Sequence, residues 1–185
     1  MNLILRLLRV VIHALFRSKL TITDESIVSF RVWFHDLDIN RHMTNSRYLA
    51  VMDLGRTDLL IRTDLGKIVW KHKWSPVLGS TSIRWRKSLL LFQKFEVHTK
   101  LAGWDDKWFY LDQKVLRKNR VVSHALQKAI FVGREGAVNT KHVIDRFEKE
   151  FGKIPAVELN DTFVNWQDSE EKMRLDIAAF EENLK

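Results

Sequence analysis

Residues 36–48 have the sequence Asp36-Leu37-Asp38-Ile39-Asn40-Arg41-His42-Met43-Thr44-Asn45-Ser46-Arg47-Tyr48. This polar stretch separates two segments with different hydrophobic periods. Residues 19–35 are rich in β-branched and aromatic side chains and alternate between two faces, which is typical of a strand. Residues 46–63 place four side chains in one row at helical spacing: Tyr48, Met52, Gly55 and Leu59. The sequence therefore predicts a strand, a short loop and a long helix, with Asn45 or Ser46 as the helix N-cap.

Four further strand-like segments follow the helix. They span roughly residues 80–88, 92–102, 107–117 and 121–132, after a loop around residues 71–76, and residues 133–136 end the sheet. On the third segment Phe109, Leu111, Gln113 and Val115 alternate with more polar positions, so one face is predicted to be the more buried. A long strand, a long helix and four strands in a meander predict an α+β fold, with one helix across one face of an antiparallel sheet. Gly55 lowers helix propensity in mid-helix and indicates a close approach to that sheet.

Composition excludes several classes of site. The chain has no cysteine, so disulfides, cysteine-ligated zinc and a cysteine nucleophile are excluded. No Gly-x-Ser-x-Gly elbow and no Walker or Rossmann glycine pattern occurs. Residues 142–185 carry a net charge of −5 and residues 1–141 carry +13. Such a basic body attracts anions or is simply solvated. Nucleic-acid binding is not expected, because most of the tryptophans fall in strand patterns.

Residues 1–18 predict an amphipathic helix. Asn2, Arg6, Arg9, His13 and Arg17 form one polar stripe, and the apolar runs between them are too short for a spanning helix or a signal peptide. Two uses remain open. The helix either packs its apolar face on the rest of the protein or a second subunit, or lies on a membrane with its arginines towards headgroups. At the other end, residues 137–185 predict two short helices, near 141–151 and 168–184, whose acidic charge suits packing on the basic body.

The residues 36–48, together with Gly55-Arg56, Gly103-Trp104 and Trp108-Phe109-Tyr110, resemble the 4-hydroxybenzoyl-CoA thioesterase-like branch of the hotdog superfamily. The family pattern is Asp-x-Asp, Gly-His, Asn-Asn and an aromatic residue near the helix start. Within this branch the chain is similar to the group that includes the animal thioesterase-superfamily member 6 proteins. The resemblance implies a hotdog fold over residues 19–136, between the N-terminal helix (1–18) and a helical extension (137–185). It also implies a dimer with the acyl-CoA site between subunits.

Asp38 is the predicted catalytic residue, because it matches the second Asp of the family pattern, whereas Asp36 matches a structural first Asp. Thioester hydrolysis needs a nucleophile or a base, together with donors for the developing oxyanion. A loop carboxylate supplies the former, and the free amides of the following helix supply the latter. Nucleophilic attack and general-base catalysis both remain open. Without the resemblance, Asp-x-Asp in a loop would indicate ordinary turn chemistry.

Several residues are expected to support Asp38 or to bind substrate. His42 is expected to be structural or to support the catalytic residue, Asn45 to cap the helix, and Tyr48 to lie in the core. Two positions depart from the family pattern: Arg41 replaces a Gly and Thr44 replaces an Asn. Arg41 either narrows the pocket or binds a phosphate or acyl carboxylate. The candidates for CoA phosphates are Arg84, Arg86 and Lys87. No metal site is expected from Asp36, Asp38 and His42, because their spacing fits no known ligand pattern.

The predicted function is hydrolysis of an acyl-CoA or acyl-carrier-protein thioester, without a separate cofactor. The expected assembly is a homodimer or tetramer, and the expected location is cytoplasmic, with peripheral membrane contact through residues 1–18 as an option. The departures at Arg41 and Thr44 and the N-terminal helix support a rival hypothesis, in which a non-catalytic hotdog protein binds acyl chains or a membrane surface.

Overall fold

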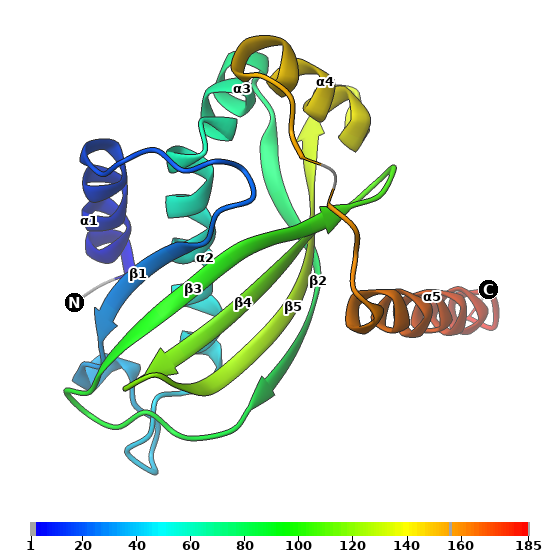
Figure 1. Ribbon diagram of the computed structural model, residues 1–185. Helices are drawn as coiled ribbons and strands as arrows, with labels where there is room; N and C mark the ends of the chain where they lie inside the picture. The colour runs from blue at the N-terminus through cyan, green and yellow to red at the C-terminus, as the bar shows by residue number, and fades with distance from the viewer. Residues whose placement is uncertain (1–2, 156, 185) are drawn as a thin grey trace.

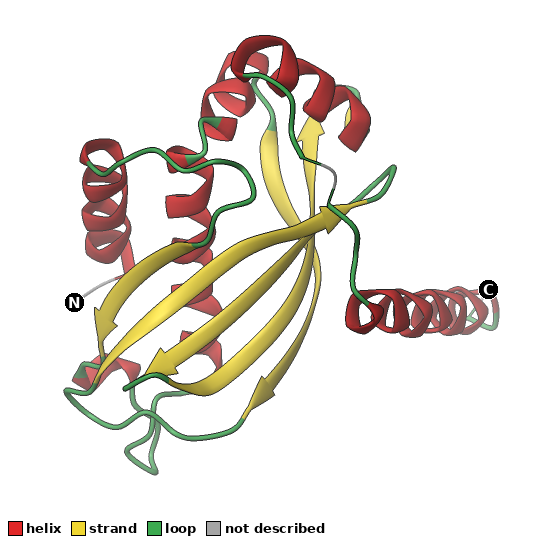
Figure 2. Cartoon of the chain, viewed as in Figure 1, coloured by secondary structure: helices red, strands yellow, loops and turns green. Residues whose placement is uncertain are grey.

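The computed structural model describes residues 3–155 and 157–184 (Figure 1, Figure 2). The chain forms five α-helices, one 3-10 turn and six strands within those residues. In chain order they are α1 (Leu3–Phe16), β1 (Ser26–Arg31), η1 (Phe34–Asp36), α2 (Asn45–Arg62), α3 (Leu65–His72), β2 (Ser75–Trp85), β3 (Lys94–Trp104), β4 (Phe109–Arg117), β5 (Arg120–Gly133), β6 (Gly136–Val138), α4 (Thr140–Phe151) and α5 (Asp161–Glu182).

The strands form one antiparallel sheet in the order β1-β3-β4-β5-β2, with the short β6 also paired to β5. The sheet curls around α2, so the predicted α+β hotdog fold is confirmed (Figure 1). The predicted four-strand meander is wrong in one respect. Only β3, β4 and β5 form a meander, because β2 pairs with β5 and leaves its other edge open. The connection from Arg86 to Gln93 crosses the end of the sheet, which places β1 next to β3.

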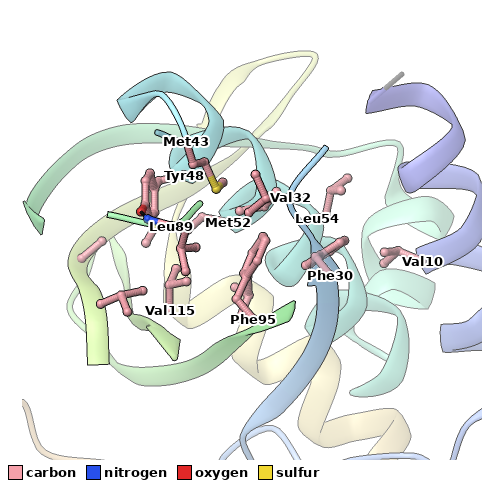
Figure 3. Packing of buried hydrophobic residues seen from close by; sticks show 14 residues of the cluster. Val10, Phe30, Val32, Met43, Tyr48, Met52, Leu54, Leu89, Phe95 and Val115 are labelled. Carbon is pink, nitrogen blue, oxygen red and sulfur yellow. Dashed lines mark hydrogen bonds between the residues drawn. The ribbon is translucent and has the colours of Figure 1, made fainter. Parts of the chain in front are cut away.

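The helix α2 packs closely on the concave face of the sheet. A Cβ atom at Gly55 would lie 2.6 Å from Oγ1 of Thr99 and 2.9 Å from Cγ1 of Val97, so only glycine fits this contact. The surrounding core includes residues from α1, α2 and four strands. Figure 3 shows its members pointing toward one another, among them Val10, Phe30, Tyr48, Met52 and Phe95. Burial of these side chains is the main force that holds α2 against the sheet.

A second core lies at the other end of α2, under α3 and α4. It joins Leu59 of α2 and Ile68 of α3 to Phe109, Phe131 and Phe147. Helix α3 is absent from the sequence prediction, which placed only a loop around residues 71–76. The pattern Leu65, Ile68 and Val69 is helical, but eight residues form too short a run to stand out from sequence alone.

The helix α1 turns a narrow face with one arginine and small apolar residues toward the protein. Arg6, Val10 and Ala14 face the protein and are buried. The larger apolar side chains face outward and are exposed: Ile4, Leu5, Leu8, Ile12, Leu15 and Phe16. These larger apolar residues therefore do not pack on their own chain, because the inner face is built around the buried Arg6, and packing on a second subunit stays a prediction.

Other boundaries differ in ways that local chemistry explains. The predicted strand at 19–35 is confined to Ser26–Arg31, since Asp24 closes a turn by accepting a hydrogen bond from the Thr21 amide at 2.7 Å. Strand β2 starts at Ser75, five residues earlier than predicted. Helix α5 starts at Asp161, earlier than predicted, because the Asn160 side chain caps it by accepting from the Phe163 amide. The acidic helices do contact the basic body: Lys71 pairs with Glu150, and Lys128 with Glu170 at 2.8 Å.

Candidate active site

The loop between η1 and α2 is a narrow antiparallel turn. Its two sides meet in a bridge between Leu37 and Met43, and the Asp38 amide donates to the His42 carbonyl at 2.8 Å. The Arg41 amide donates to the Asp38 carbonyl at 3.0 Å, and Arg41 itself has φ of 60°. This is the position where the resembled family commonly has glycine. The loop therefore keeps a left-handed backbone that glycine adopts freely, although an arginine occupies it.

The Asp38 side chain organises this turn. Its Oδ1 accepts hydrogen bonds from the amides of Asn40 at 2.8 Å and His42 at 3.1 Å. The residue is exposed, and Oδ2 accepts no hydrogen bond from the part of the chain that the structure describes. The carboxylate thus has one oxygen in the turn and one oxygen open to solvent. Turn chemistry and catalysis are compatible at this residue, because they use different oxygens.

Asp36 is fully buried and anchors the loop to the rest of the chain. Its carboxylate accepts two hydrogen bonds from the Arg6 guanidinium, at 3.0 and 2.5 Å, and one from the Trp33 amide at 2.9 Å. Its carbonyl accepts from the Thr44 amide at 2.9 Å. The structural role implied by the resemblance agrees with this geometry. The partner from α1 was not anticipated from sequence, since Arg6 lies thirty residues away.

The first turn of α2 offers free amide groups at the base of the loop that carries Asp38. The N-cap is Thr44 rather than Asn45 or Ser46, and it makes no side-chain capping bond. Its hydroxyl instead lies 2.7 Å from that of Ser46. Among the described residues nothing accepts from the amides of Asn45 and Ser46, which start the helix. Such amides, together with the positive end of the helix dipole, can bind an anion or an oxyanion.

Tyr48 fixes the start of α2 to the segment that follows β2. Its hydroxyl accepts from the Leu89 amide at 3.2 Å (Figure 3) and also donates to the Lys87 carbonyl at 3.4 Å. Burial raises the pKa of the Tyr48 phenol. The prediction of Tyr48 as a core residue is confirmed. His42 is half-buried and forms a bridge with Leu90, so it lies on the same seam, while Asn45 is exposed.

The three predicted CoA-phosphate residues are all exposed. Arg86 and Lys87 lie in the segment that Tyr48 holds beside α2, and Arg84 is on β2. Lys87 also lines a cleft of about 350 Å³ with three cationic residues of the β4–β5 turn: Arg117, Lys118 and Arg120. The sequence analysis placed those residues where one predicted strand ends and the next begins, and gave them no role in binding. The signal in the sequence was the cluster of positive charges, which can attract an anion.

An apolar pocket of about 280 Å³ lies between α2 and the strands β2, β4 and β5. Its walls include Leu59, Leu111 and Phe131, and its polar side is formed by Asp53, Arg56 and Thr57. The sequence analysis did not single out Asp53 or this pocket. The signal that could have found this polar side is the pair Asp53 and Arg56, an acid and a base three residues apart on the helix that also carries Gly55.

Arg56 is held at this pocket by a buried polar network. Its Nη1 donates to Oε1 of Gln113 at 3.1 Å and to Oε1 of Gln127 at 2.6 Å, and its Nη2 pairs with Asp53. Burial lowers the pKa of Arg56 to about 10, so the guanidinium stays charged at neutral pH. The side chain of Asp53 is 60% exposed, so Asp53 is, after Asp38, a second solvent-exposed carboxylate of the candidate site.

A single chain does not bring all of these parts together. The Asp38 loop precedes the first turn of α2, whereas the apolar pocket begins at Asp53, about 12 Å further along the helix at 1.5 Å per residue. The described residues contain no group of His, Cys, Asp and Glu side chains able to hold a metal ion. Likewise, no helix among residues 3–155 and 157–184 has both the length and the apolarity to cross a bilayer.

The chain is similar to some known proteins in sequence and to others in fold. The chain is 38% identical over 116 residues to Protein THEM6 of Danio rerio (62% of this chain, 57% of the relative), and 34% identical over 135 residues to Protein THEM6 of Xenopus laevis (71% and 62%). It therefore spans less than two thirds of the length of these relatives. Among solved structures, the YbaW probable thioesterase of Escherichia coli superimposes with a TM-score of 0.62 at 20% identity, covering 69% of this chain and 96% of that one.

A gentisyl-coenzyme A thioesterase also superimposes on the chain, with a TM-score of 0.54 at 21% identity over 61% of this chain and 91% of that one. At such identities the structural likeness shows the fold alone. The sequence profile of the thioesterase-like superfamily gives stronger evidence than these structures. It matches residues 32–167, which include the Asp38 loop, α2 and strands β2 to β5. On that match, the chain belongs to the thioesterase-like superfamily.

Proposed function

We propose that the chain hydrolyses an acyl-CoA to a free acid and CoA, with Asp38 as the catalytic carboxylate. The observation that carries this proposal is the position of Asp38. Its open Oδ2 lies in the loop that leads into the free amides of Asn45 and Ser46. A carboxylate and oxyanion donors next to each other are what acyl transfer requires.

Two routes use the same groups. In the first, Asp38 attacks the thioester carbonyl, the C–S bond breaks, and the CoA thiolate leaves a mixed anhydride that water then hydrolyses. In the second, Asp38 takes a proton from water while the resulting hydroxide attacks the carbonyl. The tetrahedral oxyanion then collapses, and the departing thiolate takes up that proton. In both routes the helix amides stabilise the oxyanion, and the carboxylate is regenerated.

The phosphates of CoA have a matching surface. The cleft of about 350 Å³ is lined by Lys87, Arg117, Lys118 and Arg120. Of these, Lys87 lies on the segment that Tyr48 ties to the start of α2. Arg84 and Arg86 are exposed nearby in the chain and can contribute charge. One structural neighbour, a Staphylococcus aureus protein with a TM-score of 0.56 at 13% identity, was solved in complex with CoA. Acyl carrier protein is the alternative carrier, and its acidic surface would meet the same cations.

The acyl group has a matching pocket, provided that two copies associate. The apolar pocket opens beside Val77 and Leu78 on the open edge strand β2. A second copy paired at that edge would bring side chains of its own, next to the pocket of the first copy. We therefore propose a homodimer in which the site is shared between subunits.

The test is thioester cleavage over a panel of acyl-CoAs of increasing chain length. Asp38→Asn is the informative variant, because an asparagine oxygen can still accept the two turn hydrogen bonds while the negative charge is lost. We expect its kcat to fall by about 10²- to 10⁴-fold, with an unchanged melting temperature. Asp53→Asn is the matched control at the other exposed carboxylate of this face. Equal activity of Asp38→Asn and wild type would remove Asp38 from the mechanism, and selective loss in Asp53→Asn would transfer the role to Asp53.

Contact with a membrane surface is a second proposal, carried by the outward apolar face of α1. Leu8, Ile12 and Leu15 are exposed on it. A groove of about 690 Å³ beside it is lined by five cationic residues and one acid: Arg9, Arg31, Lys94, Arg117, Lys118 and Glu96. An apolar helix face next to basic residues suits an anionic lipid surface. The corresponding location is cytoplasmic and peripheral to a membrane.

Vesicle flotation tests this membrane proposal. Deleting residues 1–18 would also remove Arg6 and its two hydrogen bonds to the buried Asp36, so a substitution on the outer face is the better variant. We expect Leu8→Glu/Ile12→Glu to abolish flotation with vesicles containing anionic lipid, whereas Leu175→Glu on the far helix α5 leaves it unchanged. Flotation of the double variant at the wild-type level would contradict membrane contact through α1.

A further inference from the structure

The helix α5 contacts the convex face of the sheet through its first turns. Three residues that it contacts form one row across neighbouring strands. Tyr110 of β4 is paired with Lys128 of β5, and Lys128 is paired with Ser80 of β2. Phe163 packs edge-on against Tyr110 at 5.8 Å, and Gln167 donates to the Tyr110 hydroxyl at 2.6 Å.

The next turn of α5 reaches the last two strands of the sheet. Glu170 pairs with Lys128 at 2.8 Å. Partial burial opposes ionisation of Glu170, but its pKa lies below the usual value because Lys128 and Ser80 both donate hydrogen bonds to it. The contacts therefore run from β4 to β5 to β2 as the helix advances. Glu170 marks the point where α5 reaches the open edge of the sheet.

Beyond Glu170 the helix continues past that edge. Every residue from Glu171 to Leu184 is exposed, and Figure 1 shows α5 projecting away from the sheet. The twelve residues from 171 to the helix end at 182 extend about 18 Å, which is the width of nearly four strands at about 4.8 Å each. Strand β2 itself has no partner on this side among the described residues, and Val77, Leu78 and Trp85 are exposed along it.

The projecting half of α5 carries an apolar stripe. Met173, Ile177, Phe180 and Leu184 follow one another at intervals of four, three and four residues and are all exposed. This is the spacing by which a helix presents one continuous seam to a partner. The stripe is continuous with Trp166, which lies over Lys128 of its own sheet at 6.0 Å. The same helix side thus begins on one sheet and continues beyond it.

We propose that the C-terminal half of α5 is an arm that binds a second copy of this chain across the open β2 edge. A copy paired at that edge extends the sheet and presents another convex face in the path of the arm. Residues 171–184 contain four acids and two bases. On the convex face Lys114 pairs with Asp112 and Lys128 with Glu170, so the exposed Lys100 is the lysine there that can meet an acid of the arm. This proposal extends the homodimer proposed above and is independent of the thioester chemistry.

Sedimentation equilibrium with matched variants tests the arm. We expect wild type to be a dimer and Met173→Glu/Ile177→Glu to raise the dimer Kd by at least about tenfold. Leu175→Glu is the control, because Leu175 and Ile177 are both 53% exposed but lie on opposite sides of the helix. Met173, Leu175 and Ile177 are all more than half exposed, so circular dichroism should be unchanged in the variants.

Hydrogen exchange provides the second measurement. Amides 171–182 are expected to be protected at dimer concentrations and to lose protection on dilution and in the double variant. A wild type that stays monomeric would overturn both the arm and the dimer. A stable dimer whose Kd does not respond to the double variant, or responds equally to Leu175→Glu, would overturn the arm and leave the dimer standing. Thioesterase activity is measured separately and decides neither result.

Discussion

The ion pair between Arg6 and Asp36 joins the N-terminal helix to the candidate catalytic loop, and Arg6→Met tests it. The two side chains are 3% and 0% exposed. Arg6 makes two hydrogen bonds to the carboxylate and a third to the Arg31 carbonyl at 3.1 Å. Methionine keeps the apolar stem and removes the guanidinium, so the perturbation falls on the charge rather than on packing.

The expected loss of stability is large because a buried carboxylate is left behind. Removing one partner of a buried pair costs about 3–5 kcal/mol. The Trp33 amide still donates to Asp36, and the His35 ring and the Arg47 guanidinium lie 3.4 and 3.8 Å from its Oδ1. These groups offset part of the cost, which places the expected loss near the lower limit, about 3 kcal/mol. That is a large share of the roughly 5–15 kcal/mol that stabilises a typical domain.

Urea unfolding followed by tryptophan fluorescence, at one fixed protein concentration, measures this loss. A double-mutant cycle with Asp36→Asn should give a coupling energy of at least about 1 kcal/mol, because asparagine no longer needs a cation. Arg9→Met is the control: Arg9 is exposed on the same helix, and the change should stay within about 0.5 kcal/mol. If Arg6→Met were as stable as Arg9→Met, the argument that α1 is held by this pair would be refuted.

Three further predictions concern the core, the loop and the convex face. Gly55→Ala should destabilise the fold by about 1–3 kcal/mol in urea unfolding, since its Cβ would lie 2.6 Å from Thr99 Oγ1; an increase in stability would show that the helix can shift away. Arg41→Gly should raise stability by up to about 1 kcal/mol by relieving the left-handed backbone, and a lower melting temperature would contradict this. Partial burial opposes ionisation of Asp105, but hydrogen bonds from Tyr110 and the Trp108 amide hold its pKa below 3.8. Its contribution is therefore complete above that pH and lost as the pH falls below it, so Asp105→Asn should flatten the acid limb of a stability-pH curve.

Local chemistry made much of this chain predictable. The loop from Asp36 to Thr44 follows from turn-forming residues, and α2 follows from its apolar row, because both depend on neighbours only a few residues apart. The three strands of the meander were placed to within about two residues, since alternation and turn signals such as Lys118-Asn119, with φ of 49° and 58°, are also local.

The candidate site was predictable only in part, for the same reason. Asp38 stood out because it belongs to a short continuous motif. Arg56 and its network did not, because Gln113 and Gln127 lie 57 and 71 residues away along the chain. The apolar pocket behind Asp53 likewise exists only once β2 has paired with β5.

The sequence by itself determined that a strand leads through a polar turn into a capped helix, and that an amphipathic helix precedes them. Only the tertiary structure decided which face of that first helix turns inward. A buried carboxylate at Asp36 requires a cation, and Arg6 supplies it, so the side with Arg6, Val10 and Ala14 faces the protein and the leucines face outward. The same holds for β2, whose position at an open edge, with α5 continuing past it, depends on pairing with residues far along the chain.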